Sequence, residues 1–452
     1  MSAPRLFGTD GVRGVANLDL TPELAFRIGR AGAVVLARES GPERPVVIGR
    51  DTRLSGTMLE AALVAGITSV GRDTLSLGVV PTPGVACITA RLEAAAGVMI
   101  SASHNPIEDN GVKFFGADGF KLRDEQEREI ERILDDESVI PRATHGHVGI
   151  ARSAHGLVDR YFTTLLEAGG DLSSLTVAVD AAFGAAFDIG PRALARLGAE
   201  VVPLHAEDDG SRINVACGST DLSALAERVR ALQEADPSAH VLGVAFDGDA
   251  DRVLFVDERG APVSGDHVML ILGRERKRLG HLPGDTVVGT VMSNAGLERA
   301  LAREGIKLLR TAVGDRYVLE AMRAEGYTFG GEQSGHIIDL DRNTTGDGPM
   351  AAVALLSIVA AQRTTLHELA AALHVYPQVL VNVRTARKHV LDDAAVRAAI
   401  ARVEAELGAE GRLLVRASGT EPLIRVMIEG DDRARIVALA DELAQVVRGA
   451  AS

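Results

Sequence analysis

The segment VLGVAF at residues 241–246 runs directly into DGDADR at 247–252, and VLFV follows at 253–256. Both flanking runs are apolar and rich in β-branched residues, which is typical of buried strands. The acidic segment is therefore predicted to be the loop that follows a strand, with three carboxylates at alternate positions. Along the rest of the chain, short β-branched runs alternate with longer amphipathic helical patterns, which indicates an α/β fold.

The three carboxylates of Asp247, Asp249 and Asp251 can converge on one hard cation, because such ions prefer oxygen ligands. A calcium loop of the EF-hand type is an alternative, since Glu258 is the twelfth residue counted from Asp247. It is disfavoured because the sixth position of that loop requires glycine and is Arg252 here. A solvated acidic turn is the other alternative. A magnesium ion here would keep positions open for phosphate oxygens, which points to phosphoryl transfer.

A chain of 452 residues is too long for one core and predicts three or four domains. Strand runs at 46–48, 177–179 and 287–288 each lead into a loop of small or polar residues and then a helix, which indicates three related βαβ units. The first helix is predicted to begin after Thr21 as its N-cap. The tail, from 379 to 447, has a β-α-β-β-α order that suits a smaller α+β domain. The predicted domains are 1–152, 153–257, 258–373 and 374–452.

The net charge of −14 argues against a nucleic-acid partner, because such binding relies on a basic surface. Cys87 and Cys217 show neither metal nor disulfide spacing and are predicted to be buried thiols in a reducing compartment. The N-terminus has no signal-peptide core, and the longest apolar run, Met350–Ala361, is too short to cross a bilayer. The sequence therefore predicts a cytoplasmic protein without a membrane partner.

A second polar motif, ISASHNP at 100–106, begins in an apolar strand and offers two serines and a histidine at its carboxyl end. Open α/β sheets place their sites at this edge, and Ser101 or Ser103 could carry a phosphate there. An ordinary turn is the alternative, since Ser, Asn and Pro favour turns. Lys113, shortly afterwards, could move a proton or neutralise a phosphate.

Three further loops combine glycine with polar groups. GGEQSGH at 330–336 offers the polar edges that sugar hydroxyls need, and a hairpin with a polar tip is the alternative. RASGTEP at 416–422 and GTDGVRG at 8–14 have the composition of oxyanion nests, and ordinary loops are the alternative. Neither has the lysine spacing of a P-loop, so ATP binding is not indicated.

Taken in order along the whole chain, these five motifs resemble those of the α-D-phosphohexomutase family. The resemblance implies three related mixed-sheet α/β domains and a smaller C-terminal α+β domain around a central cleft. It also implies an isomerase that moves a phosphoryl group within a sugar phosphate by way of a phosphoserine. A homodimer is expected from the same resemblance.

The resemblance, and not the chemistry of the loop, selects Ser103 over Ser101 as the phosphoserine. It implies that Asp247, Asp249 and Asp251, completed by the Ser103 phosphate, bind one Mg²⁺ per subunit. Roles in proton handling and phosphate contact are implied for Arg13, Lys113 and His336. Contacts with the sugar phosphate are implied for Thr9, Arg252, Glu332, Ser334, Arg416, Ser418, Gly419, Thr420 and Arg425.

Within the family, Gln333 and the opening motif GTDGVRG resemble the branch that acts on glucosamine phosphates, with glucosamine 1,6-bisphosphate as intermediate and activator. Glucose or mannose phosphates are the alternative substrates. A non-catalytic sugar-phosphate sensor and a metal-dependent phosphatase are the alternative functions. Phe183 departs from the family, where a small polar residue is common, and is expected to affect packing near a domain boundary.

Overall fold

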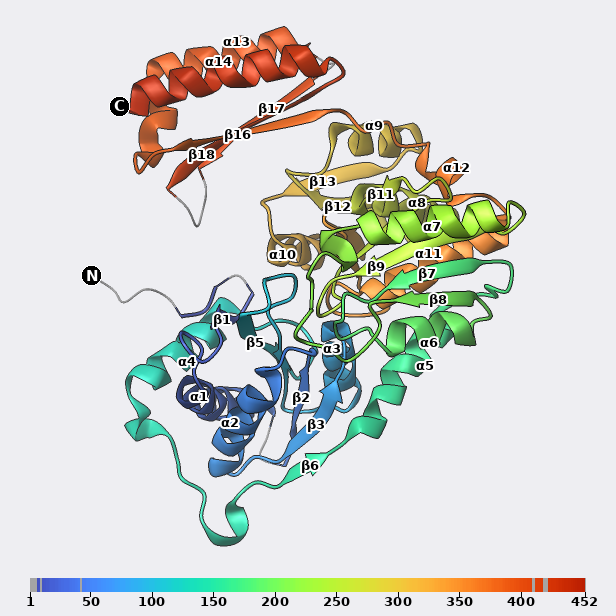
Figure 1. The fold of residues 1–452 in the computed structure, drawn as a ribbon. Helices are drawn as coiled ribbons and strands as arrows, with labels where there is room; N and C mark the ends of the chain where they lie inside the picture. The colour runs from blue at the N-terminus through green and yellow to red at the C-terminus, as the bar shows by residue number, and fades with distance from the viewer. Residues whose placement is uncertain (1–5, 9, 41–42, 409–410, 418–421, 452) are drawn as a thin grey trace.

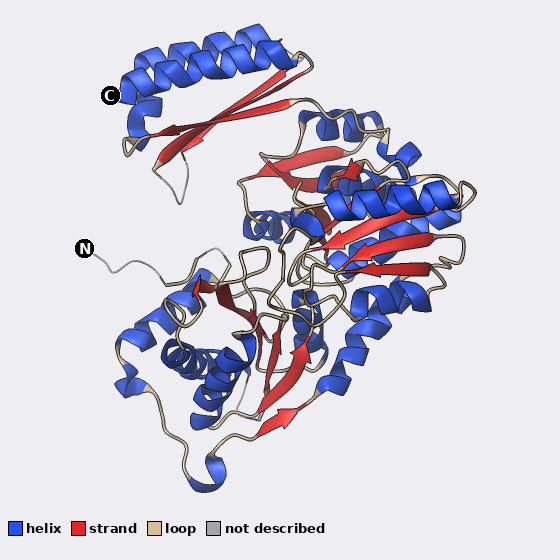
Figure 2. Cartoon of the chain, viewed as in Figure 1, coloured by secondary structure: helices blue, strands red, loops and turns tan. Residues whose placement is uncertain are grey.

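The structure, a computed structural model, describes residues 6–8, 10–40, 43–408, 411–417 and 422–451. These residues form four sheets, three of them mixed and one antiparallel, with helices packed against each (Figures 1 and 2). The predicted fold class, three related α/β domains and a smaller α+β domain, is confirmed.

The strands and helices follow domain by domain, with strands in sheet order. The first domain contains β1 (Val12–Val15), β5 (Asp109–Gly116), β4 (Ala96–Ile100), β2 (Val46–Arg50), β3 (Thr74–Val79), β6 (Ala151–Ser153), α1 (Pro22–Ser40), α2 (Gly56–Ser69), α3 (Thr82–Arg91) and α4 (Asp124–Asp135). The second contains β11 (Pro262–Val263), β10 (Val253–Val256), β9 (Val241–Phe246), β7 (Thr176–Asp180), β8 (Glu200–Leu204), α5 (Val158–Ala168), α6 (Ile189–Arg196) and α7 (Ser223–Ala235). The third contains β13 (Lys307–Thr311), β12 (Thr286–Thr290), β14 (Phe329–Gly331), β15 (Ile337–Asp339), α8 (Gly265–Arg278), α9 (Ala295–Arg303), α10 (Asp315–Glu325), α11 (Gly348–Gln362) and α12 (Leu366–Ala370). The fourth contains β16 (Gln378–Arg384), β18 (Leu423–Gly430), β17 (Gly411–Ala417), α13 (Ala394–Leu407) and α14 (Arg433–Ala451).

The first three sheets share one topology. In each, three parallel strands are followed by an antiparallel fourth, in the orders β3-β2-β4-β5, β8-β7-β9-β10 and β13-β12-β14-β15. In each repeat, the strand that comes first in the chain (β2, β7 or β12) leads into the same local turn. Asp51, Asp180 and Thr290 each accept a hydrogen bond from the backbone N–H two residues further on, at 2.9, 2.9 and 3.1 Å.

The sheet of the first domain is buried on both faces. Val46 and Ile48 of β2 lie in the core under α1 and α2, whereas Val47 lies in the core under α3 and α5. This alternation follows from the two-residue period of a strand. Thr21 caps α1 as predicted, because its Oγ1 accepts a hydrogen bond from the backbone N–H of Leu24 at 3.2 Å.

Helix α11 is apolar on every side because the first three domains cover it. Met350 packs in the core of the first domain beneath α3, and Leu356 lies in the core shared by the second and third domains. Its N-cap, Asp347, accepts a hydrogen bond from the Tyr161 hydroxyl of α5 at 2.7 Å. The long apolar run of the sequence is therefore a central core helix. Among the described residues, no helix has both the length and the apolar character needed to cross a membrane.

The fourth domain is joined to the third by buried hydrogen bonds. The Asn294 side chain donates to the carbonyl of Tyr376 and accepts from its N–H, both at 3.0 Å. Glu429 of β18 accepts from the N–H of Ala295 at 3.1 Å. Figure 1 shows this domain extending away from the first, with α13 and α14 on one face of its sheet.

Helices α1 and α2 cross so closely that one glycine cannot be enlarged. A Cβ at Gly66 would lie 2.2 Å from the carbonyl oxygen of Phe26. We expect Gly66→Ala to reduce the free energy of unfolding by about 1–3 kcal/mol, because the helices must separate. Urea unfolding followed by circular dichroism measures the change.

The matched control is Gly449→Ala in α14, where nothing lies within 4 Å of the added carbon. Alanine favours a helix over glycine by about 1 kcal/mol, so this variant should be as stable as the parent or more stable. Equal stability of the two variants would contradict the tight crossing.

Candidate active site

The loop between the third and fourth strands of each repeat reaches a common site. These loops are residues 101–108, 247–252 and 332–336. They meet because each lies at the carboxyl end of the parallel strands of its domain, the edge where such sheets place their sites. Ser103 Oγ donates to Asp247 Oδ2 at 2.7 Å and joins the first two loops. The N–H of Val253 donates to the Gly335 carbonyl at 3.0 Å and joins the second and third.

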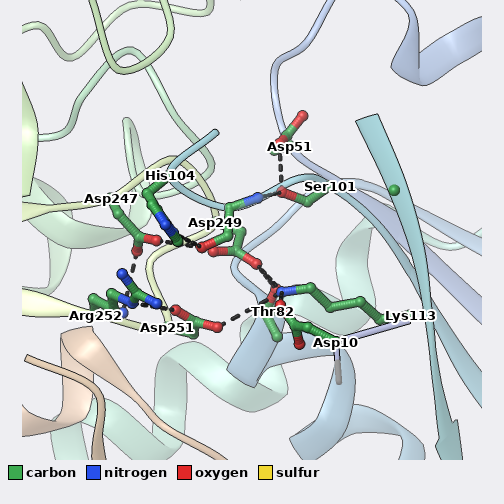
Figure 3. Close-up of polar contacts among 12 residues, drawn as sticks. Asp10, Asp51, Thr82, Ser101, His104, Lys113, Asp247, Asp249, Asp251 and Arg252 are labelled. Carbon is green, nitrogen blue, oxygen red and sulfur yellow. Dashed lines mark hydrogen bonds and ion pairs between the residues drawn. The ribbon is translucent and has the colours of Figure 1, made fainter. Parts of the chain in front are cut away.

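Ser103 is buried and held in a backbone conformation that favours glycine, with φ of +53°. Its N–H donates to Ser101 Oγ at 2.9 Å, and Ser101 Oγ donates in turn to Asp51 Oδ2 at 2.5 Å (Figure 3). Its Oγ also lies 3.3 Å from His104 Nδ1. The surrounding contacts therefore direct the hydroxyl toward the acidic loop.

The side chain of Arg53 holds this loop in place. Its fully buried guanidinium donates to the carbonyls of Ser103 at 3.0 Å, Asn105 at 2.8 Å and Asp109 at 2.9 Å, and also to that of Pro106. Its Nε pairs with Asp51 Oδ2 at 3.1 Å. Sequence reasoning missed this residue, since it lies about 50 positions from its partners and belongs to no chemical motif.

The three carboxylates predicted to bind a metal are buried together. One oxygen of each of Asp247, Asp249 and Asp251 lies within 4.8 Å of the others. Asp249 Oδ1 and Asp251 Oδ1 are buried without a hydrogen-bond partner in the described part of the chain. Burial and the charges of Asp251 and Asp249 raise the pKa of Asp247 well above its usual value. The donor set fits one hard divalent cation, which would satisfy these oxygens and offset their repulsion.

Lys113 is a fixed positive charge beside this group. Its Nζ lies 2.7 Å from Asp249 Oδ2, 3.6 Å from Asp251 Oδ2 and 3.3 Å from Asp10 Oδ2 (Figure 3). Burial opposes the charge, but the carboxylates, Asp10 foremost, raise the pKa of Lys113 above its usual value. Lys113 therefore offsets the charge of these carboxylates, and its role in proton transfer or phosphate contact stays a prediction.

Two histidines at the site differ in charge. Burial opposes protonation of His336, but Asp251 and Asp315, 3.5 and 3.4 Å from its ring nitrogens, raise its pKa to about 9. Burial and the charge of Arg252 lower the pKa of His104 to about 4. At neutral pH the site therefore holds one imidazolium and one neutral imidazole, the latter beside Ser103 Oγ.

A chain of alternating charges connects Lys113 with His336. Asp10 Oδ1 accepts from Lys121 Nζ at 2.7 Å, and Lys121 pairs with Asp315 of α10. This chain ties the first domain to the third. Asp10 belongs to the motif GTDGVRG at 8–14, whereas Lys121 and Asp315 belong to no motif that would have identified them from the sequence.

Other predicted residues lie around the same loops. Arg13 Nη1 donates to Asn105 Oδ1 at 3.1 Å, and the N–H of Arg252 donates to Asp247 Oδ1 at 3.1 Å. In the third domain, Glu332 Oε1 accepts from the N–H of Gly314 at 3.1 Å, and Ser334 is exposed at the tip of the hairpin. Thr9, Ser418, Gly419 and Thr420 lie outside the described residues.

Arg416 and Arg425 are opposite one another on β17 and β18 of the fourth domain. Burial and the charge of Arg425 lower the pKa of Arg416. Like charges facing each other across strands destabilise a sheet. Guanidinium groups bind phosphate through paired N–H donors, so these two arginines are candidates for contact with a phosphate.

Comparison with known proteins identifies the class. Four family models match in succession: phosphoglucomutase/phosphomannomutase alpha/beta/alpha domain I at residues 4–140, domain II at 159–260, domain III at 264–376 and the C-terminal domain at 380–446. The chain therefore belongs to the phosphoglucomutase/phosphomannomutase family, the α-D-phosphohexomutases.

Curated relatives named phosphoglucosamine mutase align with nearly the whole chain and are identical to it at just over half of the aligned positions. Those from Symbiobacterium thermophilum and Desulforamulus reducens are 54 % and 52 % identical to this chain, over 98 % of it and 99 % of their own length. A solved family protein from Burkholderia thailandensis has a TM-score of 0.83 at 24 % identity, covering 100 % of this chain and 98 % of its own. The Aspergillus fumigatus N-acetylphosphoglucosamine mutase, solved with GlcNAc-6P and magnesium, has a TM-score of 0.67 at 20 % identity, covering 99 % and 96 %.

We expect Arg53→Lys to lower turnover, because a lysine cannot reproduce the planar fork that holds the Ser103 loop. The variant keeps the charge beside Asp51, so kcat should fall by about 10-fold or more while the protein remains folded. Steady-state kinetics and thermal unfolding measure the two quantities. Arg50→Lys, on the same segment but paired with Glu60, is the control and should keep its turnover. Equal kcat in both variants would contradict a positioning role for Arg53.

Proposed function

We propose that this protein is a phosphoglucosamine mutase, which interconverts glucosamine 6-phosphate and glucosamine 1-phosphate through a phosphorylated Ser103. The observation that carries the proposal is the buried Ser103 hydroxyl, 2.7 Å from Asp247 in a group of three carboxylates. The name shared by the relatives at 52–54 % identity supports the choice of sugar.

Asp247, Asp249 and Asp251, with the phosphate of Ser103, would hold one Mg²⁺, which supplies positive charge to the transferring group. The magnesium in the solved fungal complex supports this choice of ion. The positive charges of Lys113 and His336 lie against the same carboxylates and would stabilise the negative charge of the reacting phosphoryl group.

In the first half of the reaction, the bond from phosphorus to Ser103 Oγ breaks and a bond forms to the free hydroxyl of the sugar phosphate. The proton of that hydroxyl is transferred overall to Ser103 Oγ, so the step balances. When the free Ser103 hydroxyl attacks in the opposite direction, the neutral His104, 3.3 Å from Ser103 Oγ, can accept its proton. The product, a 1,6-bisphosphate, then returns its other phosphoryl group to Ser103 in the second half.

The sugar must present each end to Ser103 in turn, so one site has to hold whichever phosphate is not reacting. Arg416 and Arg425 are proposed to hold that phosphate, together with Ser418, Gly419 and Thr420, which the family resemblance implies. Thr9 is proposed to contact the substrate. Glu332 and Ser334 contact the sugar hydroxyls, and Arg13 and Arg252 contact phosphate. The homodimer stays a prediction of the family resemblance, and light scattering on the purified protein measures it. The cytoplasmic location stays a prediction from the sequence.

We expect Ser103→Ala to reduce turnover by roughly 10³-fold or more, because the nucleophile is lost. Intact-mass spectrometry should show one phosphate on the parent after incubation with a sugar 1,6-bisphosphate and none on the variant. Ser101→Ala is the control: it should still accept the phosphate, with a smaller loss of rate. Phosphate on the Ser103→Ala protein would refute the assignment.

Removal of divalent ions with EDTA is expected to abolish turnover, because three buried carboxylates then repel the phosphate. Addition of Mg²⁺ in excess should restore the activity, and sodium at equal ionic strength should not. Full turnover in the metal-free protein would contradict the proposed role of the carboxylates.

Relative rates on glucosamine, glucose and mannose 1-phosphates test the choice of substrate. We expect the highest kcat/KM for the glucosamine ester. A higher value for glucose or mannose phosphate would make the protein a phosphoglucomutase or phosphomannomutase with the same machinery. Tight binding without turnover would indicate a sensor, and net release of phosphate a phosphatase.

A further inference from the structure

The second domain holds another cluster of metal-ligating side chains. Asp180 ends β7, His205 directly follows β8, and Cys217 precedes a short 3-10 helix at Gly218–Thr220. One ligand atom from each of the three residues lies within 4.8 Å of the others. None of these residues belongs to the reaction described above.

Two polar atoms of this cluster, Asp180 Oδ2 and His205 Nδ1, face each other without a hydrogen bond in the described part of the chain. Asp180 Oδ1 accepts from the N–H of Ala182 at 2.9 Å, whereas Oδ2 lies 3.0 Å from His205 Nδ1. Both of these last atoms are buried, and in the described part of the chain neither makes a hydrogen bond of acceptable geometry. Buried polar atoms without a partner lower the stability of a protein, so a cation bound to both atoms would stabilise the fold.

We propose that Asp180, His205 and Cys217 bind a thiophilic divalent cation such as Zn²⁺, at a site separate from the magnesium site. Imidazole, thiolate and carboxylate together suit a borderline-soft ion, whereas the all-oxygen set of the catalytic loop suits Mg²⁺. On binding, the S–H bond of Cys217 breaks, the sulfur lone pair enters the coordination bond, and the proton passes to solvent.

The His205 side chain is 27 % exposed, so an ion can reach the cluster from solvent. Three protein ligands leave one tetrahedral position for water.

The ligand atoms would have to move only a little to coordinate Zn²⁺ with tetrahedral geometry. Zn–S bonds of about 2.3 Å and Zn–N or Zn–O bonds of about 2.0 Å place tetrahedral ligand atoms about 3.3–3.6 Å apart. The Asp180 and His205 atoms, 3.0 Å apart, must separate slightly. The Cys217 sulfur lies within 4.8 Å of a ligand atom of each of Asp180 and His205 and would have to approach by about 1.2 Å at most.

Neighbouring residues keep the cluster in shape and connect it with Ser103. The ring centroid of Phe183 lies 5.0 Å from that of His205. Phe183, the residue that differs from the usual family pattern, therefore packs against the cluster. The Ala182 carbonyl accepts from the N–H of Asn214 at 3.1 Å, and Asn214 Nδ2 donates to the Ser103 carbonyl at 2.8 Å. An ion bound here would stiffen the segment that supports the Ser103 loop.

Co²⁺ titration of the full-length protein saturated with Mg²⁺ tests the proposal. We expect one equivalent of Co²⁺ to bind and to produce a thiolate-to-cobalt charge-transfer absorption in the near ultraviolet, which Zn²⁺ then displaces. Cys217→Ser should lose the absorption. His205→Asn should weaken Zn²⁺ binding by more than about 100-fold. Loss of a residue that only hydrogen-bonds to a metal ligand costs about 10- to 100-fold in affinity, and loss of the ligand itself should cost more. Asparagine suits the left-handed backbone at position 205.

The control is Cys87→Ser, which removes the other buried thiol and should retain the absorption. Circular dichroism verifies that each variant is folded, and His205→Asn carries the test if Cys217→Ser is not. Stoichiometric binding without a thiolate band, a band that survives in Cys217→Ser, or Zn²⁺ affinity unchanged in His205→Asn would overturn the proposal.

Discussion

The mutual repulsion of three buried carboxylates governs the arrangement of this protein. Asp247, Asp249 and Asp251 share a volume from which water is largely excluded, so their charges must be offset by other groups. Lys113 comes from β5 of the first domain and His336 from the loop before β15 of the third. Groups from the first and third domains therefore offset the charges of one loop of the second.

Repetition of one topology makes the meeting of these domains possible. Each of the first three domains contributes the loop between its third parallel strand and its antiparallel fourth, and each loop carries different chemistry. The first presents a hydroxyl, the second carboxylates, and the third a hairpin with Glu332 and His336. Helix α11, buried by all three domains, fixes their relative positions, whereas the fourth domain is joined through a smaller buried contact around Asn294.

Much of the site was visible in the sequence because each chemical group lies in a short contiguous motif after a strand. The acidic loop and the Ser103 loop are of this kind. Arg53, Lys121 and Asp315 were not visible, because each acts on residues far away in the chain and looks like an ordinary surface charge. The charge states of His104 and His336 were also hidden, since identical side chains acquire opposite pKa shifts from the groups packed against them.

The sequence by itself determined the α/β alternation, the repeat, the smaller last domain and the motifs that hold the reactive groups. These follow from periodicity and composition, which are local properties of the chain. Only the tertiary structure decided that Ser103 faces Asp247, that Arg53 is buried under the Ser103 loop, and that Asp180, His205 and Cys217 form a cluster. Such contacts join residues up to 144 positions apart, and their geometry depends on how whole domains pack.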